Sequence, residues 1–275
     1  MLHKLPISAR QLLLLAALLL AGCKSYAPAA LNVPDWSPDQ AEQTTAVIEG
    51  DVVNLHNVRH CTYRTSTDYE VTWYDKTVDL SKIRTVDYVM VPFGEVPGIA
   101  HTMLSYGFEG DDYVGVSVET RRLRDEKYNP LKGLINHYPL HYVFADESDL
   151  IGRRAIHDLN DVYVYRANAT AEQARAMFTD MLERANKLAI APEYYNTLTN
   201  NCTTNVVRHV NNVAKSERVP LNAQVLFPGY SDRLAYQLGL IASDKPFEAT
   251  KQEARVNEAA FVYRDDPNFS RLIRR

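Results

Sequence analysis

The chain has 275 residues, a formal net charge of −4 and 30 basic against 34 acidic side chains. The basic residues are dispersed and form no stripe, so we expect no nucleic-acid partner. The overall composition is that of an ordinary globular protein, and its length fits one large domain or two small ones of roughly 100–200 residues each.

The first residues have the pattern of a bacterial lipoprotein signal. Lys4 and Arg10 form a basic start, residues 12–20 are apolar throughout, and Leu-Ala-Gly-Cys ends the run at Cys23. These features are typical of a secretory signal, and the final cysteine makes it a lipobox whose thiol receives diacylglycerol. The apolar run is shorter than the roughly 20 residues of a transmembrane helix. The alternative is an ordinary secretory signal with an accidental cysteine.

The residues around Cys23 also predict where the protein resides. We expect residues 1–22 to be removed and two acyl chains on Cys23 to anchor the protein in a membrane. Lys24 follows Cys23, with no acidic residue to indicate inner-membrane retention, so we expect the outer membrane, facing the periplasm. Residues 23–45 are rich in Ala and Pro without an apolar period, which predicts a flexible tether. The folded domain is then residues 46–275.

The first part of this domain is dominated by strand-like sequence. Short segments rich in Val, Thr and aromatic residues predict strands at residues 58–63, 71–74, 86–91, 99–108, 113–120, 142–144 and 162–165.

Helical periodicity then replaces the strand pattern. Residues 170–190 carry apolar side chains at helical spacing, and Thr170 with Gln173 forms a capping-box signature. Further helices are expected from Cys202 and over residues 231–238. Residues 242–275 are weakly patterned, with one stretch, 259–263, suited to an edge strand. We therefore predict an α+β fold, an antiparallel sheet with helices packed mainly on one face.

The clearest hairpin joins residues 99–108 to residues 113–120. With the turn centred on Gly110, His101 lies opposite Glu119, and one face of the hairpin is polar while the other is apolar. A slip of one residue would mix these faces, which a half-buried sheet resists. A carboxylate beside an imidazole can fix its tautomer and stabilise the imidazolium. The alternative is a surface pair worth about 0.2–1 kcal/mol.

Cys202 is the candidate nucleophile. It follows two asparagines where a helix is expected to begin; there, unpaired backbone N–H groups and the helix dipole favour thiolate and can hold an oxyanion. A cysteine nucleophile needs a base, usually His, and His101 has the clearest strand context. The alternatives are a small buried cysteine or a disulfide with Cys61, which an oxidising periplasm permits.

Several kinds of site are not indicated by the sequence. It has no His-Glu-x-x-His spacing, no phosphate-binding glycine loop and no Gly-x-Ser-x-Gly elbow. We therefore expect neither a metal nor a cofactor.

Several segments resemble one family, over residues from about 57 to 240. They are Ile99–Thr102, Ser117–Arg121, Pro130–Leu134, Tyr195–Thr204 and Pro228–Asp232. They are similar to the periplasmic domain of the Lnb-type bacterial lipoprotein N-acyltransferases. The order of His, acid and Asn-Cys is also similar to circularly permuted papain-like folds, such as NlpC-type peptidases and lecithin:retinol acyltransferases.

The resemblance implies roles for three residues. Cys202 is the nucleophile, His101 the base and Glu119 the residue that orients the base. The implied protein is a membrane-tethered, papain-like thiol acyltransferase or hydrolase that acts on acyl groups of phospholipid or lipoprotein.

Two other functions remain open. One is a cysteine amidase or peptidase acting on peptidoglycan peptides, and the other is a non-catalytic envelope lipoprotein with a structural Cys202. A phospholipid enzyme should have an apolar channel near Cys202, and a peptidoglycan enzyme should have an open polar groove.

Overall fold

The computed structural model describes residues 34–94, 98–214 and 218–274. Asp35–Arg275 forms a compact unit. The predicted signal peptide and Cys23 lie outside the described residues. Within the described ranges, no helix is both long enough and apolar enough to cross a membrane.

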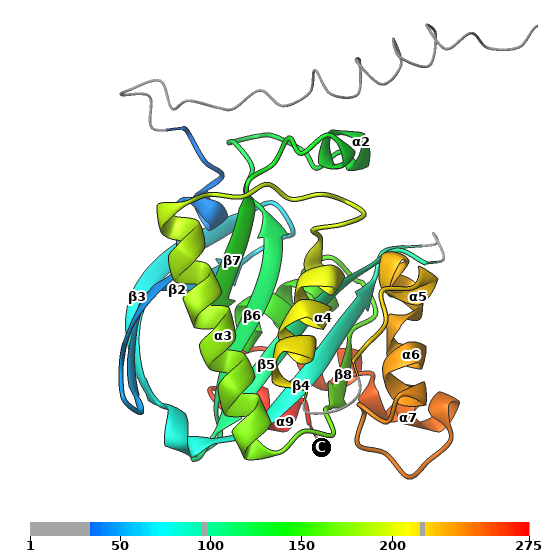
Figure 1. Ribbon diagram of the computed structural model, residues 1–275. Coiled ribbons are helices and arrows are strands. Elements are labelled where there is room, and N and C mark those ends of the chain that lie inside the picture. The colour runs from blue at the N-terminus through cyan, green and yellow to red at the C-terminus, as the bar shows by residue number, and fades with distance from the viewer. Residues whose placement is uncertain (1–33, 95–97, 215–217, 275) are drawn as a thin grey trace, which may run out of the picture. The chain divides into compact units, whose positions relative to one another are not determined.

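One sheet organises the described part of the chain (Figure 1). Its eight strands are β1 (Thr45–Glu49), β2 (Val52–Tyr63), β3 (Tyr69–Asp79), β4 (Ile83–Pro92), β5 (Ala100–Phe108), β6 (Asp112–Thr120), β7 (Leu140–Ala145) and β8 (Tyr163–Arg166). Their order is β1-β2-β7-β6-β5-β4-β8, and β3 also pairs with β2. All these pairings are antiparallel except that of β2 with β7, which is parallel and brings Arg59 beside Ala145.

Each of the strands predicted between residues 58 and 165 is present. The β5–β6 hairpin has the predicted register, with Met103 opposite Ser117 and Ser105 opposite Gly115. The turn needs Gly110, which adopts φ +83°, a conformation that costs glycine little. The division of the hairpin into two faces therefore predicts its pairing correctly.

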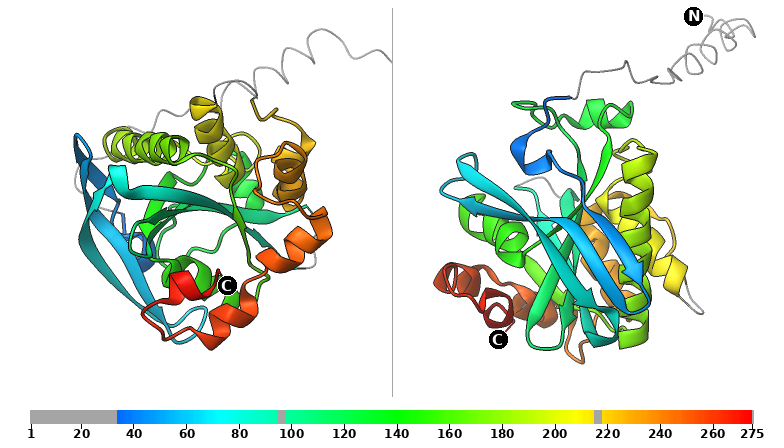
Figure 2. Two further views of the ribbon diagram at one scale, coloured as in Figure 1. Left: turned by 90° about the horizontal axis from the view of Figure 1, so that it is seen from below. Right: turned by 90° about the vertical axis from the view of Figure 1, so that its left-hand side faces the viewer.

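Helices cover both faces of the sheet (Figure 2). On one face lie α3 (Ala171–Ile190) and α4 (Cys202–Val213), whose apolar side chains join those of Leu104 and Val116 in the larger core cluster. The other face is covered by a π-helix, η3 (Ser148–His157), and by α8 (Asn257–Val262) and α9 (Phe269–Leu272). The remaining short helices are η1 (Pro38–Gln40), η2 (Leu80–Lys82), α2 (Pro130–Leu134), α5 (Ala223–Leu226), η4 (Pro228–Tyr230), α6 (Ser231–Gln237) and α7 (Phe247–Ala254).

Two expectations need correction. Helices are not confined mainly to one face, because η3 and the C-terminal helices bury a second apolar cluster around Met103 and Val143. Residues 259–263 do not form an edge strand, because α8 buries Ala260 completely against that cluster. By contrast, α3 begins at the predicted capping box of Thr170 and Gln173, and the helices predicted at Cys202 and residue 231 are α4 and α6.

Residues that the sequence assigns to the tether make contacts with the domain. Gln40 is 1% exposed, and its side-chain oxygen accepts a hydrogen bond of 2.7 Å from the backbone N–H of Arg122. Trp36 forms an isolated bridge with Leu123. The ordered structure thus includes residues before Ala46.

Candidate active site

Cys202 is the first residue of α4 and is a free, buried thiol. Asn201 caps this helix, because its side chain accepts from the N–H of Thr204 at 2.9 Å and its own N–H donates to the Thr204 hydroxyl at 2.8 Å. The N–H groups of Cys202 and Thr203 belong to the first turn, where helices have no internal partners for them. Two N–H groups at the thiol are therefore placed to stabilise an oxyanion.

The thiol of Cys202 lies near one hydroxyl group and interacts electrostatically with two phenols. The Thr203 hydroxyl lies 3.8 Å from its sulfur. Burial raises the pKa of Tyr88 and of Tyr195, and a negative charge on Cys202 would raise the pKa of both phenols further. Tyr88 and Ser231 share a hydrogen bond of 2.6 Å. The hydrogen bond with Ser231 holds the phenol of Tyr88 on the α4 side of the sheet.

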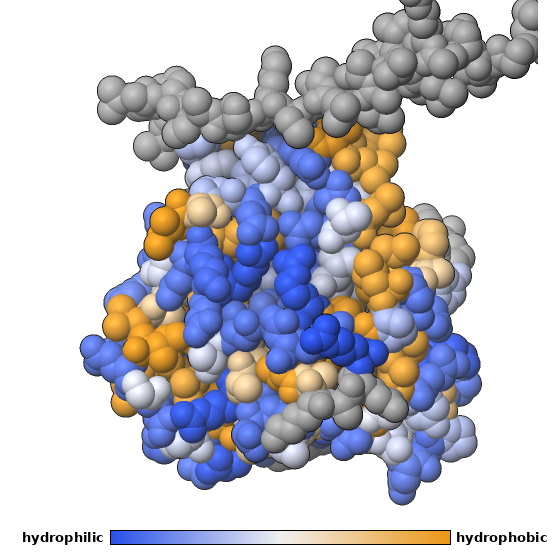
Figure 3. All heavy atoms as spheres, viewed as in Figure 1, coloured by the Kyte–Doolittle hydropathy of each residue, from blue (hydrophilic) through white to orange (hydrophobic). Residues whose placement is uncertain are grey.

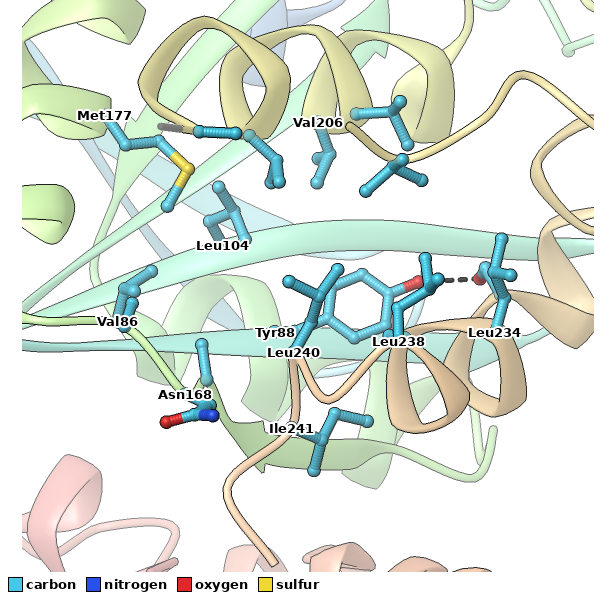
Figure 4. Close-up of a pocket in the computed structure, with 18 of the residues that line it drawn as sticks. Val86, Tyr88, Leu104, Asn168, Met177, Val206, Leu234, Leu238, Leu240 and Ile241 are labelled. Carbon is cyan, nitrogen blue, oxygen red and sulfur yellow. Dashed lines mark hydrogen bonds between the residues drawn. The ribbon is translucent and has the colours of Figure 1, made fainter. Parts of the chain in front are cut away.

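An apolar cavity of about 310 Å³ lies along α4, the helix that begins with Cys202 (Figure 4). Its wall includes Thr203, the residue next to Cys202, and continues along the same face of α4 through Val206 and Val210. Leucine and valine side chains from the sheet, α6 and the chain after it form much of the remaining wall; among them are Val86, Leu104, Leu234, Leu238 and Leu240. A cavity of this size and character suits a small apolar ligand.

His101 and Glu119 lie together on the opposite face of the sheet. The hydroxyl of Ser117 donates to Glu119 Oε1 at 2.9 Å and lies 2.7 Å from His101 Nε2. Since this hydroxyl uses its proton on Glu119, it accepts from Nε2–H of the imidazole. The nitrogen of His101 that remains an acceptor is therefore Nδ1. The prediction that His101 and Glu119 share a face is confirmed, with Ser117 between them.

Two arginines lie close to Glu119 and keep its carboxylate ionised. Arg154 lies 3.3 Å from Glu119, and Arg59 lies 3.9 Å from it. Burial opposes ionisation of Glu119, but these positive charges outweigh it and hold its pKa well below the usual range. Burial, together with the charge of Arg154, lowers the pKa of His101 to about 3. The imidazole is therefore neutral at neutral pH, beside an ionised carboxylate.

The structure does not bring Cys202 and His101 into hydrogen-bond contact. Thr102 follows His101 on β5, and successive side chains of a strand point to opposite faces. Thr102 faces α4, where its hydroxyl lies 3.0 Å from that of Thr203. His101 and Cys202 therefore each adjoin a residue of the Thr102–Thr203 contact, but their side chains lie on different sides of β5.

A buried ion pair supports the histidine side of the sheet. Arg59 binds Asp149 of η3 through two hydrogen bonds of 2.8 and 2.9 Å, and both side chains are fully buried. Cys61 donates its backbone N–H to the same carboxylate at 3.0 Å. Burial and the charge of Asp149 raise the pKa of the Cys61 thiol to about 12. Cys61 is also a free thiol, so the disulfide between Cys61 and Cys202 is not formed.

Several residues of the site could not be assigned from the sequence. Ser117 was part of the predicted polar face of the hairpin, but nothing in the sequence marked it as the link between His101 and Glu119. Tyr88 belongs to a strand with no distinctive motif. Tyr195 lies within the asparagine-rich segment before Cys202, and this position is the sequence feature that points to it. In the described ranges, no group of three or more His, Cys, Asp or Glu side chains could hold a metal ion.

The architecture is an α+β domain with a free cysteine at the start of a helix that packs on a mixed, largely antiparallel sheet. Residues 69–229, more than half of the chain, match the family model of the Lnb N-terminal periplasmic domain. The chain belongs to this family of periplasmic domains. Neither the curated proteins nor the solved structures contain a match.

Proposed function

We propose that this domain is a membrane-tethered thiol acyltransferase or hydrolase with a papain-like, circularly permuted arrangement, and that its acyl donor is a phospholipid. The observation that supports this proposal is the apolar cavity along α4, whose wall includes Thr203, the residue after Cys202. An acyl chain can lie along Val206 and Val210 while its carbonyl carbon reaches the start of α4. A peptidoglycan peptide is polar and gains little from such a wall, so the cavity favours lipid over peptide.

The chemistry follows from the first turn of α4. The sulfur of Cys202 attacks the ester carbonyl, and the N–H groups of Cys202 and Thr203 stabilise the oxyanion. When the C–O bond breaks, the thiol proton ends on the hydroxyl of the lysophospholipid and a thioester remains on Cys202. An amine then attacks the thioester to give an amide, or water attacks to give a fatty acid, and Cys202 regains its proton.

In this proposal His101 carries the proton, because an imidazole is the usual partner of a thiol nucleophile. Its assignment rests on the family resemblance rather than on a contact with Cys202. Ser117 and Glu119 favour the tautomer that leaves Nδ1 free to accept a proton. His101→Asn therefore tests the base separately from the nucleophile. We expect it to slow acylation of Cys202 by lipid.

Intact mass spectrometry tests the proposal directly. The full-length lipoprotein is incubated with phospholipid vesicles of one defined acyl chain, and in parallel with muropeptides. We expect the parent protein and Cys61→Ala to gain the mass of that acyl group, and Cys202→Ala to gain nothing. An adduct from muropeptides alone would replace this proposal with the amidase or peptidase. No adduct from either, together with an inert Cys202, would support a structural cysteine.

A further inference from the structure

Apolar side chains are exposed on and beside α2. Leu131 and Ile135 are 72% and 76% exposed, and Leu134 and Leu198 are also exposed. We call these four residues the α2 patch. Figure 3 shows apolar residues gathered over α2 at one end of the domain. Large apolar side chains that gather on a surface, rather than occurring singly, mark an interaction site.

Hydrogen bonds join the two segments that form the α2 patch. The backbone N–H of Thr197 donates to the carbonyl of Gly133 at 3.3 Å, and its hydroxyl donates to the carbonyl of Pro130 at 3.1 Å. A Cβ atom on Gly133 would lie only 2.3 Å from the Thr197 hydroxyl, so glycine permits this close approach. Leu198 is therefore held beside α2 and belongs to the same surface.

The same segment connects the α2 patch to the thiol. The side-chain amide of Asn201 donates to the carbonyl of Thr197 at 2.8 Å, and Asn201 is the cap of the helix that begins with Cys202. Tyr128 on the α2 side lies edge-on to Tyr195, with ring centroids 6.3 Å apart. A molecule that covers the α2 patch is therefore placed next to the start of α4.

The described chain also begins close to this surface. Asp35 forms an ion pair of 2.9 Å with Arg124, and the following Glu126 binds Lys132 of α2 at 2.9 Å. Residues 24–34 separate Asp35 from Cys23 and span at most about 40 Å when fully extended. A lipid on Cys23 therefore holds the α2 side of the domain within about 40 Å of the membrane.

We propose that the α2 patch docks into the phospholipid bilayer that carries the acyl chains of Cys23. This inference rests on the proposed function and on lipidation of Cys23. Leu131 and Ile135 enter the interfacial region, while the exposed Lys127 and the amine of Lys132 face the headgroups, as lysine side chains do at membrane surfaces. Docking places the start of α4 at the lipid surface, so a phospholipid acyl chain reaches Cys202 without crossing water.

Depth-dependent quenching tests this docking. Ile135→Trp and the control Val262→Trp are prepared as mature, lipidated protein and bound to phosphatidylcholine vesicles with or without brominated acyl chains. Val262 is 62% exposed and lies on α8, which packs on the face of the sheet opposite α4. The signal of Trp36 and Trp73, measured on the parent protein, is subtracted. We expect bromine to quench the indole added at position 135 by about half or more and to leave that at position 262 unchanged.

Each result decides the inference. Equal quenching at the two positions, or none at either, would overturn docking of the α2 patch. A blue shift in the fluorescence of the indole at position 135 that occurs without vesicles and grows with protein concentration would show that the patch binds a second copy of the chain instead. Selective quenching at position 135 supports docking even if Cys202 never acquires an acyl group. That combination would refute the proposed function alone.

Discussion

The hydroxyl groups of Thr102 and Thr203 lie 3.0 Å apart in the buried contact between β5 and α4. This contact lies beside both candidate catalytic residues, because His101 adjoins Thr102 and Cys202 adjoins Thr203. The contact fixes how far the start of α4 lies from the strand that carries the imidazole.

A double-mutant cycle tests this contact. Thr102→Val and Thr203→Val should each lower the free energy of unfolding by about 1–3 kcal/mol, since each leaves the other buried hydroxyl without its partner. The double variant should lose less than the sum of the two, because it leaves neither hydroxyl alone. Urea denaturation measures all four proteins. Strictly additive losses would show that the two hydroxyls do not stabilise each other.

The two free thiols should react differently. Burial and Asp149 raise the pKa of Cys61 to about 12, so almost none of it is thiolate at neutral pH, whereas Cys202 is the first residue of α4 and the nucleophile of the proposed mechanism. Iodoacetamide followed by peptide mapping should modify Cys202 at least roughly tenfold faster than Cys61. Mapping without reduction serves as the control for oxidation. Faster labelling of Cys61 would contradict the assignment of Cys202 as nucleophile.

The buried histidines predict an acid-sensitive fold. His101 and His141 have pKa values lowered to about 3 from 6.5, in each case first by burial and then by a nearby arginine. Both are neutral in the folded state, whereas in the unfolded chain they take up protons below about pH 6.5. Their contribution to the free energy of unfolding is therefore complete above about pH 6.5 and is lost as the pH falls toward about 3. The loss approaches about 1.4 kcal/mol per pH unit for each group.

His141→Phe isolates one of these contributions. Neither ring nitrogen of His141 has a hydrogen-bond partner, so phenylalanine removes a titrating group without breaking a bond. Urea denaturation between pH 6.5 and 4.5 should show a shallower decline for this variant than for the parent. That window lies above the usual pKa of Glu119, 4.5, which its surroundings lower further. An unchanged slope would show that His141 is not protected from protonation by the fold.

The ion pair between Arg59 and Asp149 should be costly to break from one side. Asp149→Asn leaves the arginine charge buried without its counterion, and we expect a loss of about 3–5 kcal/mol in the free energy of unfolding. Asp68→Asn is the matched control, because Asp68 pairs with Arg64 at the surface and its loss should change little. Similar effects of the two substitutions would contradict the role of burial.

A substitution in the cavity wall tests the proposed acyl site without changing Cys202. Val206→Phe fills space beside Thr203, so acylation of Cys202 by phospholipid should slow by roughly tenfold or more, while its rate of alkylation by iodoacetamide should change little. Val206→Ile adds a single methylene and should have a smaller effect. Equal loss of both reactions in Val206→Phe would indicate damage to the start of α4 rather than a blocked acyl site.

The local parts of the fold were predictable from sequence because their signals are local. Gly110 and the alternating faces on either side of it define the β5–β6 hairpin, and Thr170 with Gln173 defines the start of α3. No element was predicted over residues 148–157, which form the π-helix η3. It is held by Asp149, whose partner Arg59 is distant in sequence.

The relation between the candidate catalytic residues needed three-dimensional information. Sequence alternation separates His101 from Thr102, but it does not say which face of the hairpin α4 will cover. That choice depends on the larger core cluster, in which Cys202 and Val206 pack with Leu104. His101 and Glu119 could therefore be grouped from the hairpin alone, whereas the position of Cys202 relative to them could not.

The parallel pairing of β2 with β7 has a consequence for how the chain matures. Because the chain is made from its N-terminus, β1, β2 and β3 are available as a small antiparallel ribbon long before β7 appears. The edge of β2 that will receive β7 then exposes unpaired backbone groups, a known template for aggregation.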